Sequence, residues 1–178
     1  MTSELENKIK SAIRNVPDFP KKGINFKDIT PILQNPELCN RIADEFISQF
    51  QKNKIDAIIG IESRGFLFGF LLAHKMKVPF IPVRKKGKLP YETVSHAYEL
   101  EYGVAEIEMH IDSIENGANV MIHDDLLATG GTADAAAELV KKLNGNIAGY
   151  SFLIELNFLK GREKLKKHSG QIISLIKY

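Results

Sequence analysis

Two acidic residues stand a few positions before a glycine-rich turn in the stretch 120–143. Asp124 and Asp125 follow a short apolar run, and Thr-Gly-Gly-Thr at 129–132 precedes a segment with helical periodicity. Glycines let the backbone approach a ligand closely, and the free N–H groups at a helix start bind phosphate. The carboxylates suit sugar hydroxyls or a cation. This spacing predicts a site for a ribose 5-phosphate.

A strand, a polar turn and a capped helix occur in many α/β proteins. The glycine turn alone therefore leaves an ordinary loop as an equal alternative, and the acidic pair is what favours a binding site. Two other phosphate-binding motifs do not fit the sequence, which has neither a G-x-x-x-x-G-K-[ST] loop nor a G-x-G-x-x-G dinucleotide fingerprint.

The stretch 124–132 resembles the phosphoribosyl pyrophosphate (PRPP) signature of type I phosphoribosyltransferases, and most closely that of the adenine-specific members. That signature is an apolar strand, two acidic residues, a short spacer and a small-Thr-Gly-Gly-Thr loop. The resemblance implies that one set of residues binds the ribose and phosphate of PRPP or AMP: Asp124, Asp125, Ala128, Thr129, Gly130, Gly131 and Thr132.

A second expected junction of strand, turn and helix, at 60–65, contains an arginine. By itself it is better explained as a helix cap with a solvated Arg64. It resembles the pyrophosphate loop of the superfamily, usually Asp-Ser-Arg-Gly and here beginning with Glu62, in which a cis peptide is typical. The run 84–90, whose four cations lie within 84–88, is otherwise a solvated loop and resembles the entry to the catalytic loop. The implied pyrophosphate ligands are Ser63, Arg64, Arg84 and Lys88.

The segment at about 16–34 is punctuated by proline and glycine, and we expect an irregular stretch there. A packed surface arm is the alternative to a functional role. The segment resembles the hood of adenine phosphoribosyltransferases, which implies that Asn25, Phe26 and Lys27 face the purine. The family more often has Arg at position 27, so backbone contacts would survive and a bidentate side-chain role would not. Leu156 is implied as a second apolar wall, with a plain core leucine as the alternative.

The stretch His96–Ile111 alternates as strands do, with a bend expected at Gly103. We expect a flexible loop at about 85–102 with its tip at 91–95. Leu-Glu-Tyr-Gly at 100–103 matches the family motif whose glutamate is the proposed general acid/base, which implies Glu101 as the catalytic residue. Spacing alone does not separate it from three other glutamates of this stretch: Glu99, Glu106 and Glu108.

Apolar periodicity predicts the remaining elements, with Ser3 and Glu6 as a capping box for the first helix. The expected helices begin near residues 3, 36, 66 and 133, and the expected strands are 55–59, 78–83, 120–122, 147–154 and 172–176. This alternation predicts one α/β domain, 1–178, with a mostly parallel central sheet flanked by helices. The resemblance specifies a type I phosphoribosyltransferase fold with a small N-terminal hood and a flexible catalytic loop.

Composition is that of an ordinary globular domain, with 44% apolar and 26% charged residues among 178. A net charge of +2 is too small to indicate a nucleic-acid surface. Cys39 is the single cysteine, so no internal disulfide is possible and a reducing compartment fits. The first ten residues lack the apolar core of a signal peptide, and the apolar run 65–73 is too short to span a membrane. We therefore expect a cytoplasmic protein without a membrane partner.

The resemblance implies an enzyme of purine salvage that converts adenine and PRPP to AMP and pyrophosphate. Mg²⁺ is implied as a cofactor carried by PRPP, with no metal ligand from the protein, and a homodimer is implied as the assembly. The five histidines lack metal-ligand spacing, and the role of His123, beside the acidic pair, stays open. The alternatives are another purine base as substrate, a PRPP-sensing regulator, and an inert interaction domain.

Overall fold

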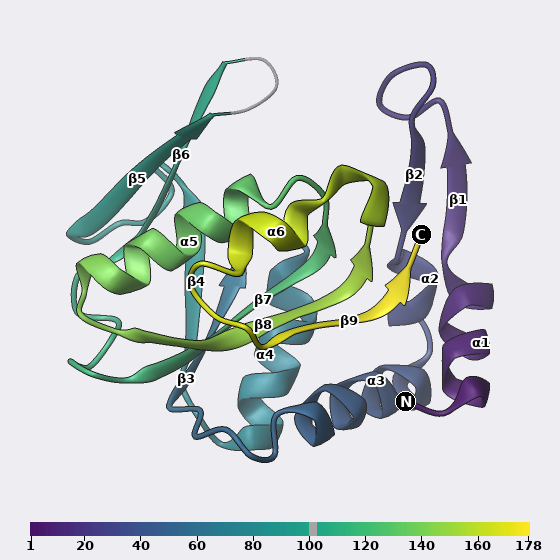
Figure 1. Cartoon of the computed structure of the whole chain (residues 1–178), viewed down its shortest axis with the longest axis horizontal. Helices are drawn as coiled ribbons and strands as arrows, with labels where there is room; N and C mark the ends of the chain where they lie inside the picture. The colour runs from purple at the N-terminus through teal and green to yellow at the C-terminus, as the bar shows by residue number, and fades with distance from the viewer. Residues whose placement is uncertain (100–102) are drawn as a thin grey trace.

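A computed structural model gives the fold of the chain and describes residues 1–99 and 103–178. Within them, a seven-stranded sheet has the order β5-β6-β4-β3-β7-β8-β9 (Figure 1). Its parallel strands are β3 (Ala57–Ile61), β4 (Phe80–Lys85), β7 (Asn119–Leu127), β8 (Asn146–Glu155) and β9 (Ile172–Lys177). The antiparallel strands β5 (Thr93–Glu99) and β6 (Val104–His110) extend one edge. The sheet is mostly parallel, as the sequence predicts.

Helices cover both faces of this sheet (Figure 1). One apolar core lies between the sheet and α5 (Gly131–Lys142), with Leu165 at the end of α6 (Gly161–Leu165). The other lies beneath a larger group of helices: α1 (Ser3–Ala12), α2 (Thr30–Leu33), α3 (Pro36–Gln49) and α4 (Gly65–Met76). A 3₁₀ turn, η1 (Asn157–Leu159), follows β8. Burial of both faces explains why the inner strands read as continuous apolar runs.

Local chemistry sets the helix starts. Asn35 caps α3 by accepting a hydrogen bond from the Leu38 N–H, and Pro36 occupies the first helical position. The expected capping box at the first helix is wrong in detail. The Thr2 side chain is the cap of α1 and accepts from the Leu5 N–H, so Ser3 already lies inside the helix. Neighbouring Thr and Ser have similar capping power, and sequence does not decide between them.

The segment expected to be irregular is partly regular. It contains the end of β1 (Arg14–Pro17), then β2 (Asn25–Asp28) and α2. The two strands form an antiparallel hairpin beside the main sheet, close to the C-terminus in Figure 1. Prolines and glycines in the connection concealed these short strands, because Pro17 pairs at the hairpin's end and Gly23, with φ +90°, lies between them.

The strand before the glycine turn is longer than its apolar run. β7 continues through Asp124 and Asp125 to Leu127, and pairs with β8 along this length. The expectation that the carboxylates end the strand at Ile122 is therefore wrong. Pairing with β8 satisfies the backbone there whatever the side chains are, so a polar residue does not end the strand.

β5 and β6 form an arm beyond β4 (Figure 1). Thr93 already pairs with His110 and Ser95 with Glu108, so the expected loop tip at 91–95 is misplaced. The bend expected at Gly103 is confirmed, with φ +94° just before β6. Glu101, the expected catalytic residue, lies outside the described residues.

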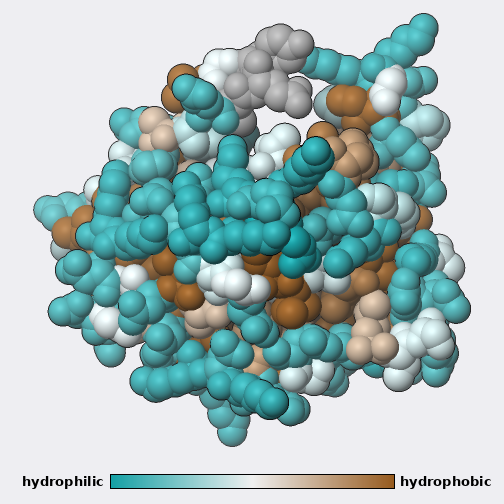
Figure 2. All heavy atoms as spheres, in the orientation of Figure 1, coloured by the Kyte–Doolittle hydropathy of each residue, from teal (hydrophilic) through white to brown (hydrophobic). Residues whose placement is uncertain are grey.

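Hydrophilic residues dominate the face of the molecule that carries α5 and α6 (Figure 2). The apolar residues of α5 point inward, where Ala136, Leu139 and Val140 are fully buried. Among the described residues, no helix is long and apolar enough to cross a membrane.

Candidate active site

The carboxyl ends of β3, β4 and β7 lie side by side at one edge of the sheet. Each is followed by one of the predicted ligand-binding segments: 62–65 after β3, 84–88 around the end of β4, and 128–132 after β7. Ligands of open α/β sheets bind at this edge. The topology therefore brings together three segments that the sequence separates by up to 70 residues.

The glycine turn is a closely packed start of α5. Gly130 has φ +79° and forms the N-cap, and a Cβ placed on it would lie 2.7 Å from the carbonyl oxygen of Gly161. Asp124 and the turn residues, from Ala128 through Thr132, line one small hollow. Thr132 Oγ1 lies 3.2 Å from the hydroxyl of Tyr98 on β5. The turn thus has the open backbone and free helix start that a phosphate requires.

Asp125 of the acidic pair is buried, and Asp124 beside it is half-buried. Asp124 Oδ1 accepts a hydrogen bond from the Asp125 N–H at 2.8 Å, and Asp125 Oδ2 lies 3.0 Å from Nε of Arg64. Burial raises the pKa of Asp124, and the negative charge of Asp125 raises it further. Burial also raises the pKa of Asp125, against the opposing charge of Arg64. Arg64 is the cation that faces the carboxylates of Asp124 and Asp125. Hydrogen-bond donors or a further cation supplied by a ligand would therefore stabilise the ionised form of the pair.

The segment after β3 has the local form that the resemblance implies. The peptide bond Glu62–Ser63 is cis, and Arg64 stands at the start of α4. The guanidinium of Arg64 lies over the ring of Phe26, 4.8 Å from its centroid, and its Nη1 is buried without a hydrogen bond in the described structure. Arg64 thus joins the predicted pyrophosphate segment to the hairpin β1–β2 and to the acidic pair.

The hairpin directs its side chains to two sides. Phe26 faces Arg64 and also packs edge-on against Phe19, with ring centroids 5.2 Å apart. Lys27 instead donates to the side chain of Asn15, and its ammonium lies 4.1 Å from the ring centroid of Tyr178. Strand alternation turns the side chains of Lys27 and exposed Asn25 away from the side on which Phe26 meets Arg64.

Leu156 lies at the end of β8, where its N–H donates to the carbonyl of Leu127. Its side chain packs on the core cluster beneath α1–α4. This position is compatible both with an apolar wall for the base and with a plain core leucine. The following turn is held by Arg162, which donates to the Glu155 carboxylate through Nε at 2.9 Å and to the carbonyl of Ile172 at 2.7 Å. This ion pair fixes the connection from β8 to α6.

His123 is packed in the core and is not part of the site. Its ring is fully buried, with Nδ1 2.8 Å from Ser151 Oγ and Phe46 edge-on at 5.5 Å. Burial lowers its pKa to about 3, so the imidazole is neutral. The role that the sequence left open is therefore packing.

The contacts of three residues in this region do not follow from the sequence. Gly161 packs so tightly on the glycine turn that a Cβ would clash with the carbonyl oxygen of Ala128. Glu62 and Glu108 bind the basic run 84–89. A glycine beside the helix start and a carboxylate beside the basic run are common in sequences, and only the fold shows which of them are in contact.

Two other features lie away from this edge. Asp134, Glu138 and His168 place potential ligand atoms within 4.8 Å of one another, although 30 residues separate the last two along the chain. Lys167 Nζ and His168 Nε2 lie 2.8 and 2.6 Å from Asp134 Oδ1, so the cluster is explained by ion pairing.

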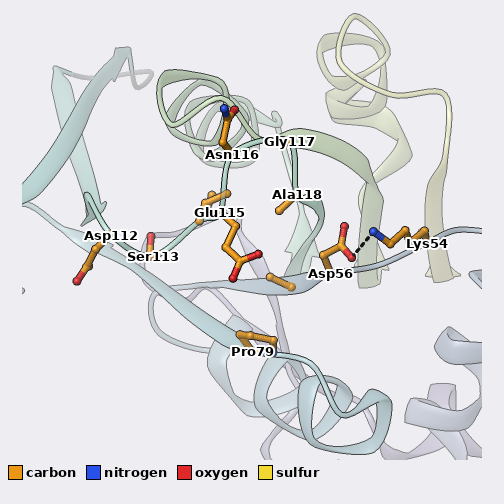
Figure 3. Close-up of a pocket in the computed structure, with 11 residues that line it drawn as sticks. Lys54, Asp56, Pro79, Asp112, Ser113, Glu115, Asn116, Gly117 and Ala118 are labelled. Carbon is orange, nitrogen blue, oxygen red and sulfur yellow. Dashed lines mark ion pairs between the residues drawn. The ribbon is translucent and has the colours of Figure 1, made fainter.

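A hollow of about 460 Å³ lies near the amino ends of β3 and β7 (Figure 3). Its charged groups include Asp56, which forms an ion pair with the exposed Lys54 at 3.0 Å. Asp56 also accepts hydrogen bonds from Asn119. None of the predicted site residues lines this hollow, so the candidate site is the opposite edge of the sheet.

Comparison with known proteins decides the family. Residues 28–176 match the phosphoribosyl transferase domain family. The chain is 54% identical to the adenine phosphoribosyltransferase of Cytophaga hutchinsonii, over 99% of both chains. The chain belongs to the adenine phosphoribosyltransferase family. This membership confirms the expected enzyme class, a pentosyl-transferring transferase, and the expected type I phosphoribosyltransferase fold.

Two solved structures of adenine phosphoribosyltransferases share this fold. That from Thermoanaerobacter pseudethanolicus is 51% identical, has a TM-score of 0.93, and matches 97% of this chain and 99% of its own. That from Saccharomyces cerevisiae, solved with adenine and an imino-altritol bisphosphate, is 45% identical with a TM-score of 0.91, covering 98% and 99% of the two chains.

The packing of Gly161 on the glycine turn gives a first prediction. Gly161→Ala would displace the turn through its clash with Ala128, and we expect the KM for PRPP to rise about tenfold or more, since misplaced binding groups cost roughly that much. Steady-state kinetics would measure it. Gly170→Ala is the matched control, because a Cβ at Gly170 meets nothing within 4 Å. Equal KM values in the two variants would contradict the assigned position of the turn.

Proposed function

We propose that this protein transfers the phosphoribosyl group of PRPP to adenine, forming AMP and releasing pyrophosphate. The observation that carries the proposal is the meeting of three chemistries at one sheet edge. These are the open helix start at Gly130, the acidic pair at Asp124 and Asp125, and the cation Arg64. They match in order the phosphate, the ribose diol and the pyrophosphate of PRPP.

The 5-phosphate binds at the helix start, where backbone N–H groups and the hydroxyls of Thr129 and Thr132 donate to its oxygens. The acidic pair accepts hydrogen bonds from the ribose hydroxyls. Ser63, Arg64, Arg84 and Lys88 surround the pyrophosphate, and their charges stabilise the negative charge that develops as it leaves. Support comes from the common edge on which these segments lie.

Mg²⁺ is proposed to accompany PRPP. The site fits a cation that PRPP carries, since the carboxylate oxygens of half-buried Asp124 and buried Asp125 lie at the proposed ribose position, where Arg64 is paired with Asp125. When bound, Mg²⁺ neutralises pyrophosphate charge as a Lewis acid. The protein's own contribution is to orient the ribose and to hold the arginines and the lysine against the leaving group.

Adenine is proposed to lie against the Phe26 ring, beneath the hood at about 16–34. The backbone groups of Asn25 and Lys27 would accept from the 6-amino group, and Leu156 would form an apolar wall. Support comes from the placement of Phe26 against Arg64, which puts this ring next to the pyrophosphate segment.

A reducing cytoplasmic compartment is proposed as the location of the protein. It suits the single cysteine, Cys39, which forms no disulfide in the described structure.

Base choice tests the proposed activity. With PRPP and Mg²⁺, we expect AMP from adenine and at least about 10³-fold lower kcat/KM with hypoxanthine or guanine. A 6-oxo base would leave buried acceptors of the hood unpaired, and such polar mismatches discriminate strongly. Chromatography of the nucleotide products provides the measurement. Comparable use of hypoxanthine would contradict the adenine assignment and leave the PRPP site in place.

Glu101 is proposed as the general acid/base that exchanges the purine proton during attack through N9. The proposal rests on the Leu-Glu-Tyr-Gly match, since this residue lies outside the described residues. General acid–base assistance is worth roughly 10²–10⁴-fold. Glu101→Gln should lower kcat within about that range with little change in the Kd for PRPP.

Glu99 provides the matched control, since it is an exposed glutamate at the end of β5. Glu99→Gln should leave kcat within about twofold of wild type, as is usual for an exposed side chain. Single-turnover kinetics of both variants would separate chemistry from product release. Small and equal effects would assign the proton transfer to water or to the substrate.

A homodimer is proposed as the assembly. The exposed face of α4 supports this, because Leu67 and Phe70 lie one turn apart and are 46% and 61% exposed. Sedimentation velocity should give twice the chain mass, and Phe70→Asp should shift the protein toward monomer. Phe158→Asp is the control, since Phe158 is 71% exposed but lies away from α4 in the η1 turn. An active wild-type monomer at working concentration would contradict the proposal.

A further inference from the structure

One carboxylate contacts both basic side chains assigned to the pyrophosphate from the 84–88 run. Glu62 Oε1 lies 2.7 Å from Lys88 Nζ, and Glu62 Oε2 lies 3.3 Å from Arg84 Nε. Oε2 also accepts a hydrogen bond from the Lys85 N–H at 2.9 Å. Arg84 Nη1 in turn donates to the carbonyl of Lys88 at 3.1 Å. The two cations are thus held in one arrangement around a single carboxylate.

A second carboxylate holds the backbone of the same run. Glu108 on β6 accepts hydrogen bonds from the N–H groups of Lys88 and Leu89 at 3.0 and 2.9 Å. Glu108 is 4% exposed, so this anchor is part of the protein interior. The two glutamates have different tasks, since Glu108 fixes the path of the chain and Glu62 fixes the charged ends of the side chains.

The side chain of Glu62 is 10% exposed. Burial opposes its ionisation, but hydrogen bonds from Lys88, from the Lys85 backbone and from Arg84 outweigh burial and lower its pKa to about 2. Glu62 therefore carries a full negative charge at physiological pH. A fixed negative charge beside a pyrophosphate site repels the pyrophosphate. Glu62 would therefore weaken binding unless it also has a favourable effect on the site.

The position of Glu62 in the chain indicates what this favourable effect is. Glu62 is the first residue after β3, and its N–H donates to the carbonyl of Val83 on β4. It stands next to Ser63 and Arg64, which are assigned to the same pyrophosphate. Long flexible side chains such as Lys88 lose considerable rotamer entropy when a ligand orders them, and a partner that orders them beforehand removes that loss.

We propose that Glu62 is a positioning residue that holds Arg84 and Lys88 together at the edge of β3 and β4, ready to transfer to the oxygens of pyrophosphate. The inference rests on the proposed function and adds a role for a residue that contacts the binding cations. Glu62 touches neither the ribose nor the base in this account, and acts only through the two cations.

The test measures binding of inorganic pyrophosphate with Mg²⁺ by isothermal titration calorimetry, together with steady-state kinetics. Glu62→Gln, nearly isosteric, should raise the Kd for pyrophosphate and the KM for PRPP about tenfold, a typical value for loss of a charge-assisted contact. The KM for adenine should stay unchanged. A general structural defect would alter both KM values and lower the melting temperature, and that result would overturn the proposal.

Glu106→Gln is the matched control. Glu106 forms an ion pair with Lys86 at 2.8 Å in the same basic run, but Lys86 is not assigned to the pyrophosphate. This variant should bind pyrophosphate as the wild type does. An equal loss of affinity in Glu106→Gln and Glu62→Gln would show that any charge lost from this region has the effect, and would overturn the positioning role.

A double-mutant cycle separates positioning from direct effects. In a background of Arg84→Ala with Lys88→Ala, Glu62→Gln should cause no further loss of pyrophosphate affinity, because the residues through which it acts are gone. A full additional tenfold loss would overturn the proposal, as would tighter pyrophosphate binding by Glu62→Gln alone, which would make Glu62 a simple competitor. Failure of the wild type to bind pyrophosphate would instead refute the proposed function.

Discussion

The ion pair between Arg64 and Asp125 is the interaction on which the site depends. Asp125 is 3% exposed and stands beside half-buried Asp124, so the strand β7 holds two adjacent carboxylates largely out of solvent near its carboxyl end. Such a pair is expensive to ionise, and Arg64, 3.0 Å away, is the protein cation that compensates it. The same guanidinium lies over Phe26 of the hairpin. One side chain therefore ties β7, the start of α4 and the hairpin into one site.

The other two cations assigned to the leaving group follow the same arrangement. Arg84 and Lys88 lie within 3.3 Å of Glu62, and the chain that carries them is fastened by Glu108. Each positive group thus has a carboxylate partner that sets its position in advance. Groups fixed before the reaction stabilise developing charge without reorganising, which is the main electrostatic advantage of an enzyme site over water.

Sequence reasoning succeeded where the chemistry is local. The Thr-Gly-Gly-Thr turn, the start of α3 at Pro36 and the alternation of β5 and β6 each depend on neighbours along the chain. It failed where tertiary contacts decide. β7 runs on through the acidic pair because β8 pairs with it as far as Leu127. Lys27 turns toward Asn15 because the two residues are partners across the hairpin of β1 and β2.

The contacts of Glu62 and Gly161 could not be predicted from spacing. Glu62 meets Lys88 across 26 residues, and Gly161 meets the turn at Ala128 across 33. Both contacts require the order of strands in the sheet, which the sequence indicates only as a class. The family resemblance predicts which residues bind the pyrophosphate. Only the structure shows that Glu62 and Glu108 hold the segment that carries Arg84 and Lys88.

The central claim, that the acidic pair binds the ribose of PRPP, is tested most directly by Asp124→Asn combined with Asp125→Asn. Titration calorimetry with PRPP and Mg²⁺ should show a loss of affinity of about tenfold or more, with circular dichroism unchanged. Asp112→Asn combined with Glu115→Gln, two exposed carboxylates at the other end of the sheet, should bind PRPP normally. Wild-type affinity and turnover in the Asp124/Asp125 double variant would contradict the account.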